Sequence, residues 1–199
     1  SVWVKVIYNG TAWEVMFHST VSAALVEEVW IPSYAMKLPT TSPGASSTMT
    51  DGGTANELDV ILFDKATEEY ARFSIVPPKN WDRQTVKAKF QWVGDAVETS
   101  GAVVWRCECT AKSAGNSWKV GGFPTSNGAS VTDSLTGVDN YEVSDWSAGF
   151  NFNGQSGAVP VALDYRISRE AADGSDTLDG DAGLHGVVLQ FGLNQLSAE

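Results

Sequence analysis

The segment TVKAKFQW, residues 85–92, decides the fold class of this chain. Apolar residues stand at every second position, with lysines and a glutamine between them. Successive side chains of a β-strand point to opposite faces of a sheet, so this pattern predicts a strand with one face on an apolar core and the other in water. The residues predicted to face the core are Val86, Ala88, Phe90 and Trp92.

A second segment with the same alternation is PVALDYRIS, residues 160–168. The residues predicted to point inward are Val161, Leu163, Tyr165 and Ile167, and those predicted to point outward are Asp164 and Arg166. Further strands are predicted at residues 58–63, 70–76, 102–110, 141–143 and 186–192. Gly- and Pro-rich turn clusters separate these segments, as is typical of a β-sandwich or barrel, so we predict an all-β protein with little helix.

The N-terminal region, residues 1–38, is predicted to form a β arm. Residues 3–8 and 12–17 alternate like the strands of a hairpin, with Asn9 and Gly10 as its two-residue turn. Residues 22–30 fit either a short helix or an edge strand. Farther along the chain, residues 111–115 fit a single helical turn.

A segment rich in Pro, Thr, Ser and Gly, residues 39–56, is predicted to be a flexible linker. It would separate the arm (1–38) from a β domain (57–199). A piece as short as the arm does not usually fold alone, yet it carries many large apolar residues. These residues are expected to pack on the β domain as part of its sandwich, on a neighbouring copy, or within a larger assembly.

The composition limits the classes of partner. The chain has 199 residues, of which 43% are hydrophobic, and a formal net charge of −11. The apolar fraction is that of a globular domain, and the negative charge disfavours nucleic-acid binding. The last third, residues 133–199, holds Arg166 and Arg169 as its only bases, which indicates a solvated acidic face or one that meets cations or a basic partner. We expect neither a signal peptide nor a membrane-spanning segment.

The two cysteines, Cys107 and Cys109, stand two positions apart in a predicted strand. Both thiols are therefore expected on its inward face, buried and reduced. A disulfide across one residue would distort an extended strand, and two cysteines alone cannot complete a four-ligand zinc site. The chain is not expected to be a module held together by disulfides.

No catalytic residue is assigned. The sequence has no Gly-x-Ser-x-Gly nucleophile elbow. Both histidines, His18 and His185, stand in or beside predicted strands, where a hydrogen-bonded structural histidine is the commoner outcome. The 24 acidic residues would permit a depolymerase that uses paired carboxylates, but no pair is singled out.

Eight tryptophans make a sugar-stacking surface conceivable. Trp92 and Trp105 stand in alternating strands and are expected in the core. Trp118 and Trp146 have polar, Gly- and Ser-rich neighbours and are expected to be exposed.

The acidic segment DGSDTLDGD, residues 173–181, is the most metal-like feature. Oxygen ligands on a glycine-bearing loop suit calcium, although the spacing matches neither an EF-hand nor the glycine-rich calcium repeats. A turn whose aspartates cap their own backbone and pair with Arg169 explains the same residues. No metal and no cofactor are assigned.

Several strand and turn segments resemble a group of tailed-bacteriophage virion proteins. The resemblance covers about residues 57–192 and lies in FSIVPPKNWD (73–82), KFQW (89–92), SGAVVW (100–105), YRISREAAD (165–173) and DTLDGDAGLHGV (176–187). It implies a jelly-roll-like β domain that forms a trimer and is displayed on a virion. Assembly in the cytoplasm of a bacterial host fits the expected lack of a signal peptide and the unpaired cysteines. It implies no catalytic residue.

We therefore expect a non-enzymatic virion structural protein, namely a capsid decoration or cement protein that stabilises the shell as an oligomer. Its arm would bury Trp3, Trp13 and Trp30 across subunit boundaries, at roughly 1.5–3 kcal/mol for each side chain. The alternative is a tail-associated adsorption protein that binds a receptor or glycan through Trp118 or Trp146. The expected partners are other copies of the chain and the major capsid or tail proteins, without nucleic acid or membrane.

Overall fold

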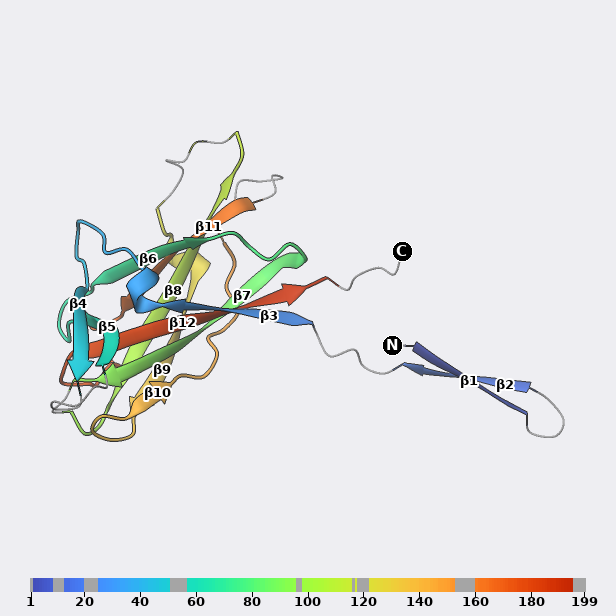
Figure 1. Ribbon diagram of the computed structural model, residues 1–199, viewed down its shortest axis with the longest axis horizontal. Coiled ribbons are helices and arrows are strands. Elements are labelled where there is room, and N and C mark those ends of the chain that lie inside the picture. The colour runs from blue at the N-terminus through green and yellow to red at the C-terminus, as the bar shows by residue number, and fades with distance from the viewer. Residues whose placement is uncertain are drawn as a thin grey trace.

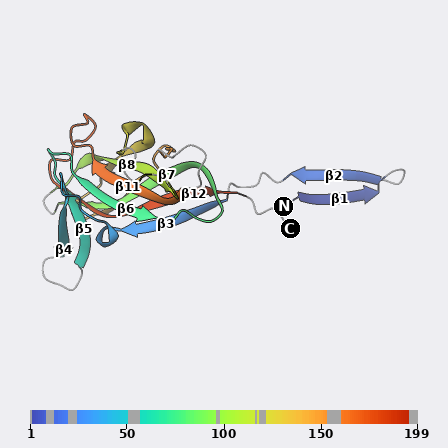
Figure 2. The same ribbon diagram turned by 90° about the horizontal axis from the view of Figure 1, so that it is seen from above.

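Two antiparallel sheets are stacked in this protein (Figures 1 and 2). The structure is a computed structural model, and it describes residues 2–8, 13–19, 25–50, 57–95, 98–115, 117, 122–152 and 160–194. Sheet I has the order β10-β7-β12-β5-β4, and β3 also pairs with β12. Sheet II has the order β6-β11-β8-β9. The predicted all-β, jelly-roll-like β-sandwich is thereby confirmed.

The elements have the following bounds. Sheet I contains β3 (Val26–Pro32), β4 (Ala45–Thr50), β5 (Glu57–Phe63), β7 (Trp81–Gly94), β10 (Tyr141–Val143) and β12 (Ala182–Leu193). Sheet II contains β6 (Tyr70–Ile75), β8 (Gly101–Ser113), β9 (Gly128–Leu135) and β11 (Pro160–Arg169). Two short 3-10 helices are η1 (Ser33–Ala35) and η2 (Thr125–Asn127).

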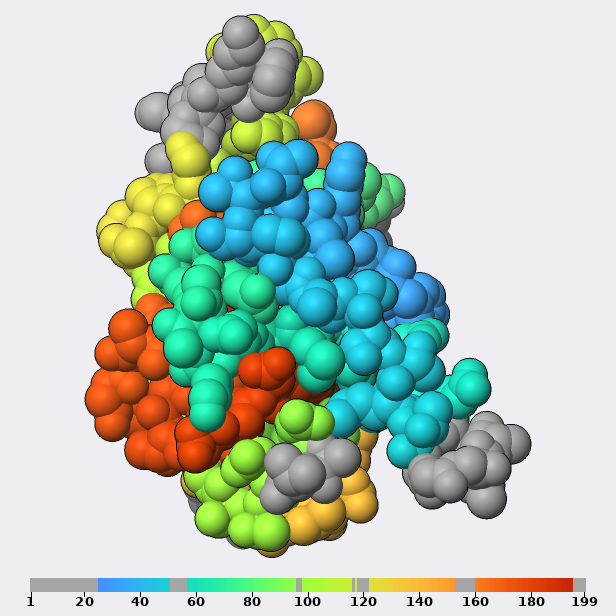
Figure 3. All heavy atoms as spheres, turned by 90° about the vertical axis from the view of Figure 1, so that its left-hand side faces the viewer, coloured from blue at the N-terminus to red at the C-terminus, as the bar shows by residue number. Residues whose placement is uncertain are grey.

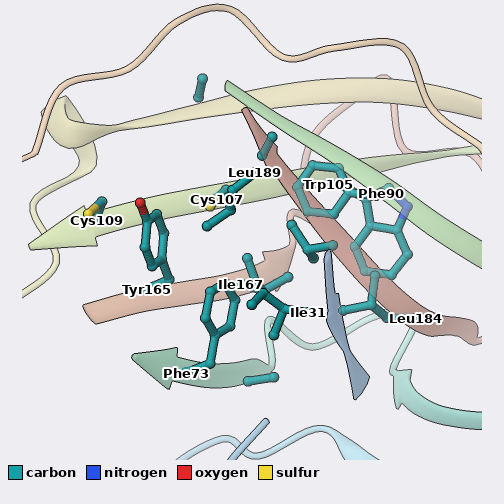
Figure 4. Packing of buried hydrophobic residues seen from close by; sticks show 14 of the residues in the cluster. Ile31, Phe73, Phe90, Trp105, Cys107, Cys109, Tyr165, Ile167, Leu184 and Leu189 are labelled. Atoms are coloured by element: carbon teal, nitrogen blue, oxygen red, sulfur yellow. The ribbon is translucent and has the colours of Figure 1, made fainter. Parts of the chain in front are cut away.

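The core lies between the sheets and is built from the alternating residues of the long strands (Figure 4). The four residues of β7 predicted to face inward are all buried. Trp105 of β8 is central: its ring stacks on Phe90 at 5.7 Å and meets Phe63 edge-on at 5.4 Å. Burying a side chain of this size stabilises the fold by roughly 1.5–3 kcal/mol, which makes these contacts between the sheets the main attraction joining them.

One inward prediction is wrong. In β11, Leu163, Tyr165 and Ile167 are buried as expected, but Val161 is 51% exposed. The register between β11 and β8 shifts between Pro160 and Ala162. This bulge adds one residue at Val161 and breaks the strict alternation on which the prediction depended.

The strands do not follow the expected division into arm, linker and β domain. β3 lies within residues 1–38, yet it pairs with β12, and its Ile31 belongs to the core (Figure 4). The open choice for residues 22–30 is thus resolved as a strand over Val26–Pro32. The arm's strand completes the sandwich, which is one of the alternatives that the sequence left open.

The segment expected to be a linker, residues 39–56, is partly structured. β4 lies within it and pairs with β5 from Ala45 to Thr50. Ahead of β4 the chain crosses to sheet II, where Lys37 exchanges backbone hydrogen bonds with Arg72 of β6. Figure 3 shows this blue segment spread beside the teal residues around β5 and β6. Its Ser- and Thr-rich composition resembles a linker because an edge strand lies half in water and needs few apolar residues.

Strands β1 (Val2–Tyr8) and β2 (Trp13–Ser19) form the predicted N-terminal hairpin as a separate two-stranded sheet, which Figure 2 shows apart from the sandwich. Tyr8 is opposite Trp13, and the predicted turn at Asn9 and Gly10 lies outside the described residues. The predicted helical turn at 111–115 is also wrong, because β8 continues to Ser113. The side chains of Trp3, Trp13 and His18 lie outside the described part of the chain, and the role of the hairpin as an oligomer arm stays a prediction.

The acidic segment 173–181 is organised by Arg169, whose side chain is fully buried. Asp176 accepts two hydrogen bonds from this guanidinium, at 3.0 Å and 2.7 Å, and also accepts one from the backbone N–H of Val104. The carbonyls of Leu178 and Gly180 accept further hydrogen bonds from Arg169. The predicted pairing with Arg169 and the predicted capping turn are confirmed, the latter by the bond from the Ser175 N–H to Asp173.

Removing the carboxylate partner of Arg169 tests how much this buried ion pair stabilises the fold. We expect Asp176→Ala to lower the free energy of unfolding by about 3–5 kcal/mol, because it leaves Arg169 charged and unpaired in the interior. Asp179→Ala, in the same segment, is the control: its side chain is exposed and pairs with Lys65 at the surface, so the loss should be much smaller. Urea denaturation followed by tryptophan fluorescence measures both values. Equal losses in the two variants would contradict this account.

Both cysteines are buried and unpaired, as predicted, and both face the core from β8 (Figure 4). Burial raises the pKa of the Cys107 thiol well above its usual range and raises that of Cys109 to about 12. The thiolate is the reactive form, so the folded protein should be inert to thiol reagents. We expect no reaction with Ellman's reagent at pH 8 in the native state and two reacting thiols per chain in urea. Rapid native labelling would show that this part of the core opens.

Candidate functional site

Three aromatic side chains form a row on the outer face of sheet I. They are Trp30 on β3, His185 on β12 and Tyr141 on β10. The His185 ring lies between the other two, with its centroid 5.7 Å from each. Trp30 and Tyr141 are each 45% exposed. We call these three residues the aromatic row.

A β-bulge in β12 places the middle of the row. Leu184 pairs with Trp92 of β7, but the next paired residue is Gly186, opposite Gln91. His185 is therefore an extra residue in β12. Because Leu184 points into the core, the bulge leaves His185 and Gly186 both on the outer face.

The neighbour on the other side of β12 changes at the same point. Leu184 pairs with Ile61 of β5, whereas Gly186 pairs with Pro32 of β3. His185 thus stands where β5 gives way to β3. Its Nδ1 lies 3.1 Å from the backbone carbonyl of Asp59, which also accepts a 2.8 Å hydrogen bond from the Ser33 hydroxyl.

This hydrogen bond assigns the ring proton. A carbonyl only accepts, so Nδ1 of His185 carries the hydrogen and donates it to Asp59. In the neutral imidazole, Nε2 is then left as an acceptor. The ring is held in one orientation by the sheet itself, which makes it a fixed part of the face.

Glycine at position 186 lets Trp30 lie against the sheet. A Cβ atom on Gly186 would stand 2.5 Å from Nε1 and 3.1 Å from Cε2 of Trp30. The indole therefore packs directly on the backbone of β12, beside His185. The exposed side of this ring is a flat apolar surface.

The other end of the row is fixed by a polar contact. The Tyr141 hydroxyl donates a 3.0 Å hydrogen bond to the side-chain carbonyl of Gln91. Burial raises the pKa of Tyr141, so the phenol stays protonated and remains a donor at neutral pH. The amide nitrogen of the same Gln91 side chain carries two N–H donors.

A fourth aromatic ring lies at the edge of sheet I, in the chain that follows β10. Ser144 and Ser147 fasten the chain to β7: their N–H groups donate to the carbonyls of Phe90 and Ala88, and their hydroxyls accept from the same two residues. These bonds cover an edge of β7. Trp146, held between the two serines, is half-buried, and the Lys89 ammonium lies 4.6 Å from its ring centroid.

The predicted site residues are only partly brought together. Trp92 and Trp105 are buried as expected, and His185 is the predicted hydrogen-bonded structural histidine. Trp146 was expected to be exposed and is half-buried beside the row. Trp118 lies outside the described residues.

Sequence reasoning missed the aromatic row. Positions 30, 141 and 185 are far apart along the chain, and only the sheet register brings them together. The signal that was available was the glycine that follows His185, because an isolated glycine inside a strand pattern points to a bulge or a close approach.

The outer face of sheet II has a different chemistry. Glu108 is buried there and accepts hydrogen bonds from both Arg106 and Arg166. The Arg166 guanidinium also lies 4.5 Å from the Tyr70 ring and 5.2 Å from the Phe123 ring. These charged groups are satisfied by one another, so this face offers few unused polar groups to a ligand.

Among the residues that the structure describes, no group of three or more His, Cys, Asp or Glu side chains is placed to hold a metal ion. Within the same ranges, no helix has the length and apolarity needed to cross a membrane. Asp176, the central carboxylate of the acidic segment, is occupied by Arg169.

Comparison with known proteins gives remote structural likeness only. No protein-family model and no curated protein matches the chain. Among solved structures, TmCBM27, a carbohydrate-binding module studied for specific mannan recognition, is 13% identical, covering 85% of this chain and 99% of that chain with a TM-score of 0.39. A family 11 carbohydrate-binding module from Clostridium thermocellum, bound to a β-1,3-1,4-mixed-linked tetrasaccharide, is 9% identical over 98% and 99%, with a TM-score of 0.36. TM-scores this low carry no inference about the ligand of this chain.

The packing of Trp30 on Gly186 can be tested without a ligand. In Gly186→Ala the new methyl group forces the indole off the strand, so the Trp30 indole N–H signal should shift strongly in a ¹⁵N NMR spectrum. The signal is assigned by its loss in Trp30→Phe. Gly174→Ala is the control, because nothing lies within 4 Å of a Cβ atom at that position. An unmoved Trp30 signal in Gly186→Ala would contradict the geometry.

Proposed function

We propose that this chain is a non-catalytic binding module and that the outer face of sheet I recognises a glycan. The observation that carries the proposal is the aromatic row of Trp30, His185 and Tyr141, which is exposed in part and crosses the sheet. Pyranose rings present flat faces of C–H groups that pack on aromatic rings, and their hydroxyls need hydrogen-bond partners beside those rings. Aromatic side chains combine a large apolar surface with a polar edge in this way.

The polar groups needed for hydroxyls lie beside the rings. Nε2 of His185 is an acceptor, and the amide of Gln91 supplies donors. On β12, Gln190 bonds to Glu28 of β3 at 3.1 Å on the same outer face. All these side chains stand on paired strands, so little conformational entropy is lost when a ligand binds.

The arrangement supports binding rather than catalysis. The ring of His185 is fixed by a backbone carbonyl, and in the described part of the chain no serine hydroxyl or cysteine thiol is bonded to it. A nucleophile and its base need such a contact. The row also lies on the face of a sheet, where a chain-like ligand has access along its length.

Glycan recognition corresponds to the alternative expected from the sequence, an adsorption protein, although through other residues. Trp146 lies beside the row, whereas the row itself supplies the principal rings. The virion location, the trimer and the role of capsid decoration protein stay predictions.

Truncating the row tests the proposed function. The unmodified protein is first applied to a glycan array, and bound glycans are then titrated by calorimetry. We expect Trp30→Ala and Tyr141→Ala each to weaken binding by about ten-fold or more, as for an aromatic anchor at the centre of an interface. Phe123 lies in the loop before η2, half-buried against Arg166 of sheet II; Phe123→Ala is the matched control and should bind normally. Absence of any bound glycan, or full affinity in both row variants, would overturn the proposal.

A further inference from the structure

Two lysines share the outer face of sheet I with the aromatic row. Lys87 and Lys89 stand on β7, between the buried residues Val86, Ala88 and Phe90, so they point away from the core. Lys87 is exposed and Lys89 is half-buried. β7 is an inner strand, with β12 on one side and β10 on the other.

Both lysines lie in line with groups of the proposed binding face. Lys89 is opposite Val188 of β12, and Val188 is opposite Trp30 of β3. Lys87 is in turn opposite Gln190. A ligand that packs on Trp30 and extends across the sheet therefore passes over β7 at these two positions.

Neither lysine has a carboxylate partner in the part of the chain that the structure describes. Some other cations do have a carboxylate partner, such as Lys65 with Asp179 at 2.7 Å and Arg169 with Asp176 at 2.7 Å. Lys89 instead has its ammonium over the Trp146 ring, a contact that positions the charge without neutralising it.

The nearby acidic groups leave the lysines available. Glu28, two strands away, is engaged by Gln190, and Asp145 lies in the exposed chain along the edge of the sheet. The acidic residues elsewhere in the chain act weakly here, because charges are screened over about 8 Å at physiological ionic strength. Asp82 lies against Gly192 of β12, and its carboxylate accepts a hydrogen bond from the Gln84 N–H.

We propose that the glycan recognised by this face is anionic, with a carboxylate or sulfate on sugar rings that pass over β7; this inference rests on the proposed function. Each ammonium would donate charge-assisted hydrogen bonds to the acidic group, while the aromatic row packs on the sugar rings. Lys87 and Lys89 are thus residues that select the ligand class.

The test compares sugars that share one backbone and differ in charge. The probes are uronic acid oligomers with their carboxyl-reduced forms, and sulfated oligosaccharides with their desulfated forms. We expect the acidic member of at least one pair to bind more tightly, and the pair concerned identifies the acidic group. Lys87→Gln should weaken binding of that member about two- to five-fold and leave its neutral counterpart unchanged. The difference should shrink in 0.5 M salt, roughly as expected from screening.

Lys37→Gln is the charge-matched control, since Lys37 is exposed and its backbone pairs with β6 of sheet II. It should leave the binding of both members unchanged. Equal affinity for acidic and neutral members, with binding still lost in Trp30→Ala, would overturn this inference and keep the proposed function. No binding of any sugar would overturn both.

Discussion

The β-bulge at His185 and Gly186 is the constraint on which the outer face of sheet I depends. It adds a residue to the central strand β12, turns two consecutive positions outward, and stands where the neighbour of β12 changes from β5 to β3. A regular strand would turn only one of these positions outward. The bulge supplies both the ring at the middle of the row and the space for Trp30 beside it.

The two sheets share one core, but their outer faces differ in how far their polar and charged groups bond to one another. Sheet II covers its outer side with ion pairs around the buried Glu108, which consume the available charges. Sheet I leaves aromatic rings, amides and two lysines without such saturation. A ligand gains free energy when it buries an exposed apolar surface, and adjacent polar groups can bond to it in place of water. A network whose polar groups already bond to one another has few such groups left for a ligand.

Sequence patterns predicted what depends on local periodicity. The alternation in β7 and the burial of Cys107 and Cys109 followed directly from the pleat of a strand. The exposure of Val161 was not predicted because a bulge interrupts the alternation of β11. Strand β4 was not predicted because an edge strand made of serine and threonine lacks an apolar pattern. The aromatic row could not be predicted from the sequence, because it depends on the relative positions of β3, β12 and β10. Those positions are set by contacts between distant parts of the chain.

The most direct measurement of the central claim is an NMR titration of the protein with a glycan identified on the array, following both backbone amides and side-chain rings. The account predicts that saturating shifts cluster on Trp30, His185, Tyr141 and Gln91, with the signals of sheet II unchanged. Shifts concentrated on the outer face of sheet II or on the hairpin at residues 2–19, with the row unmoved, would contradict it.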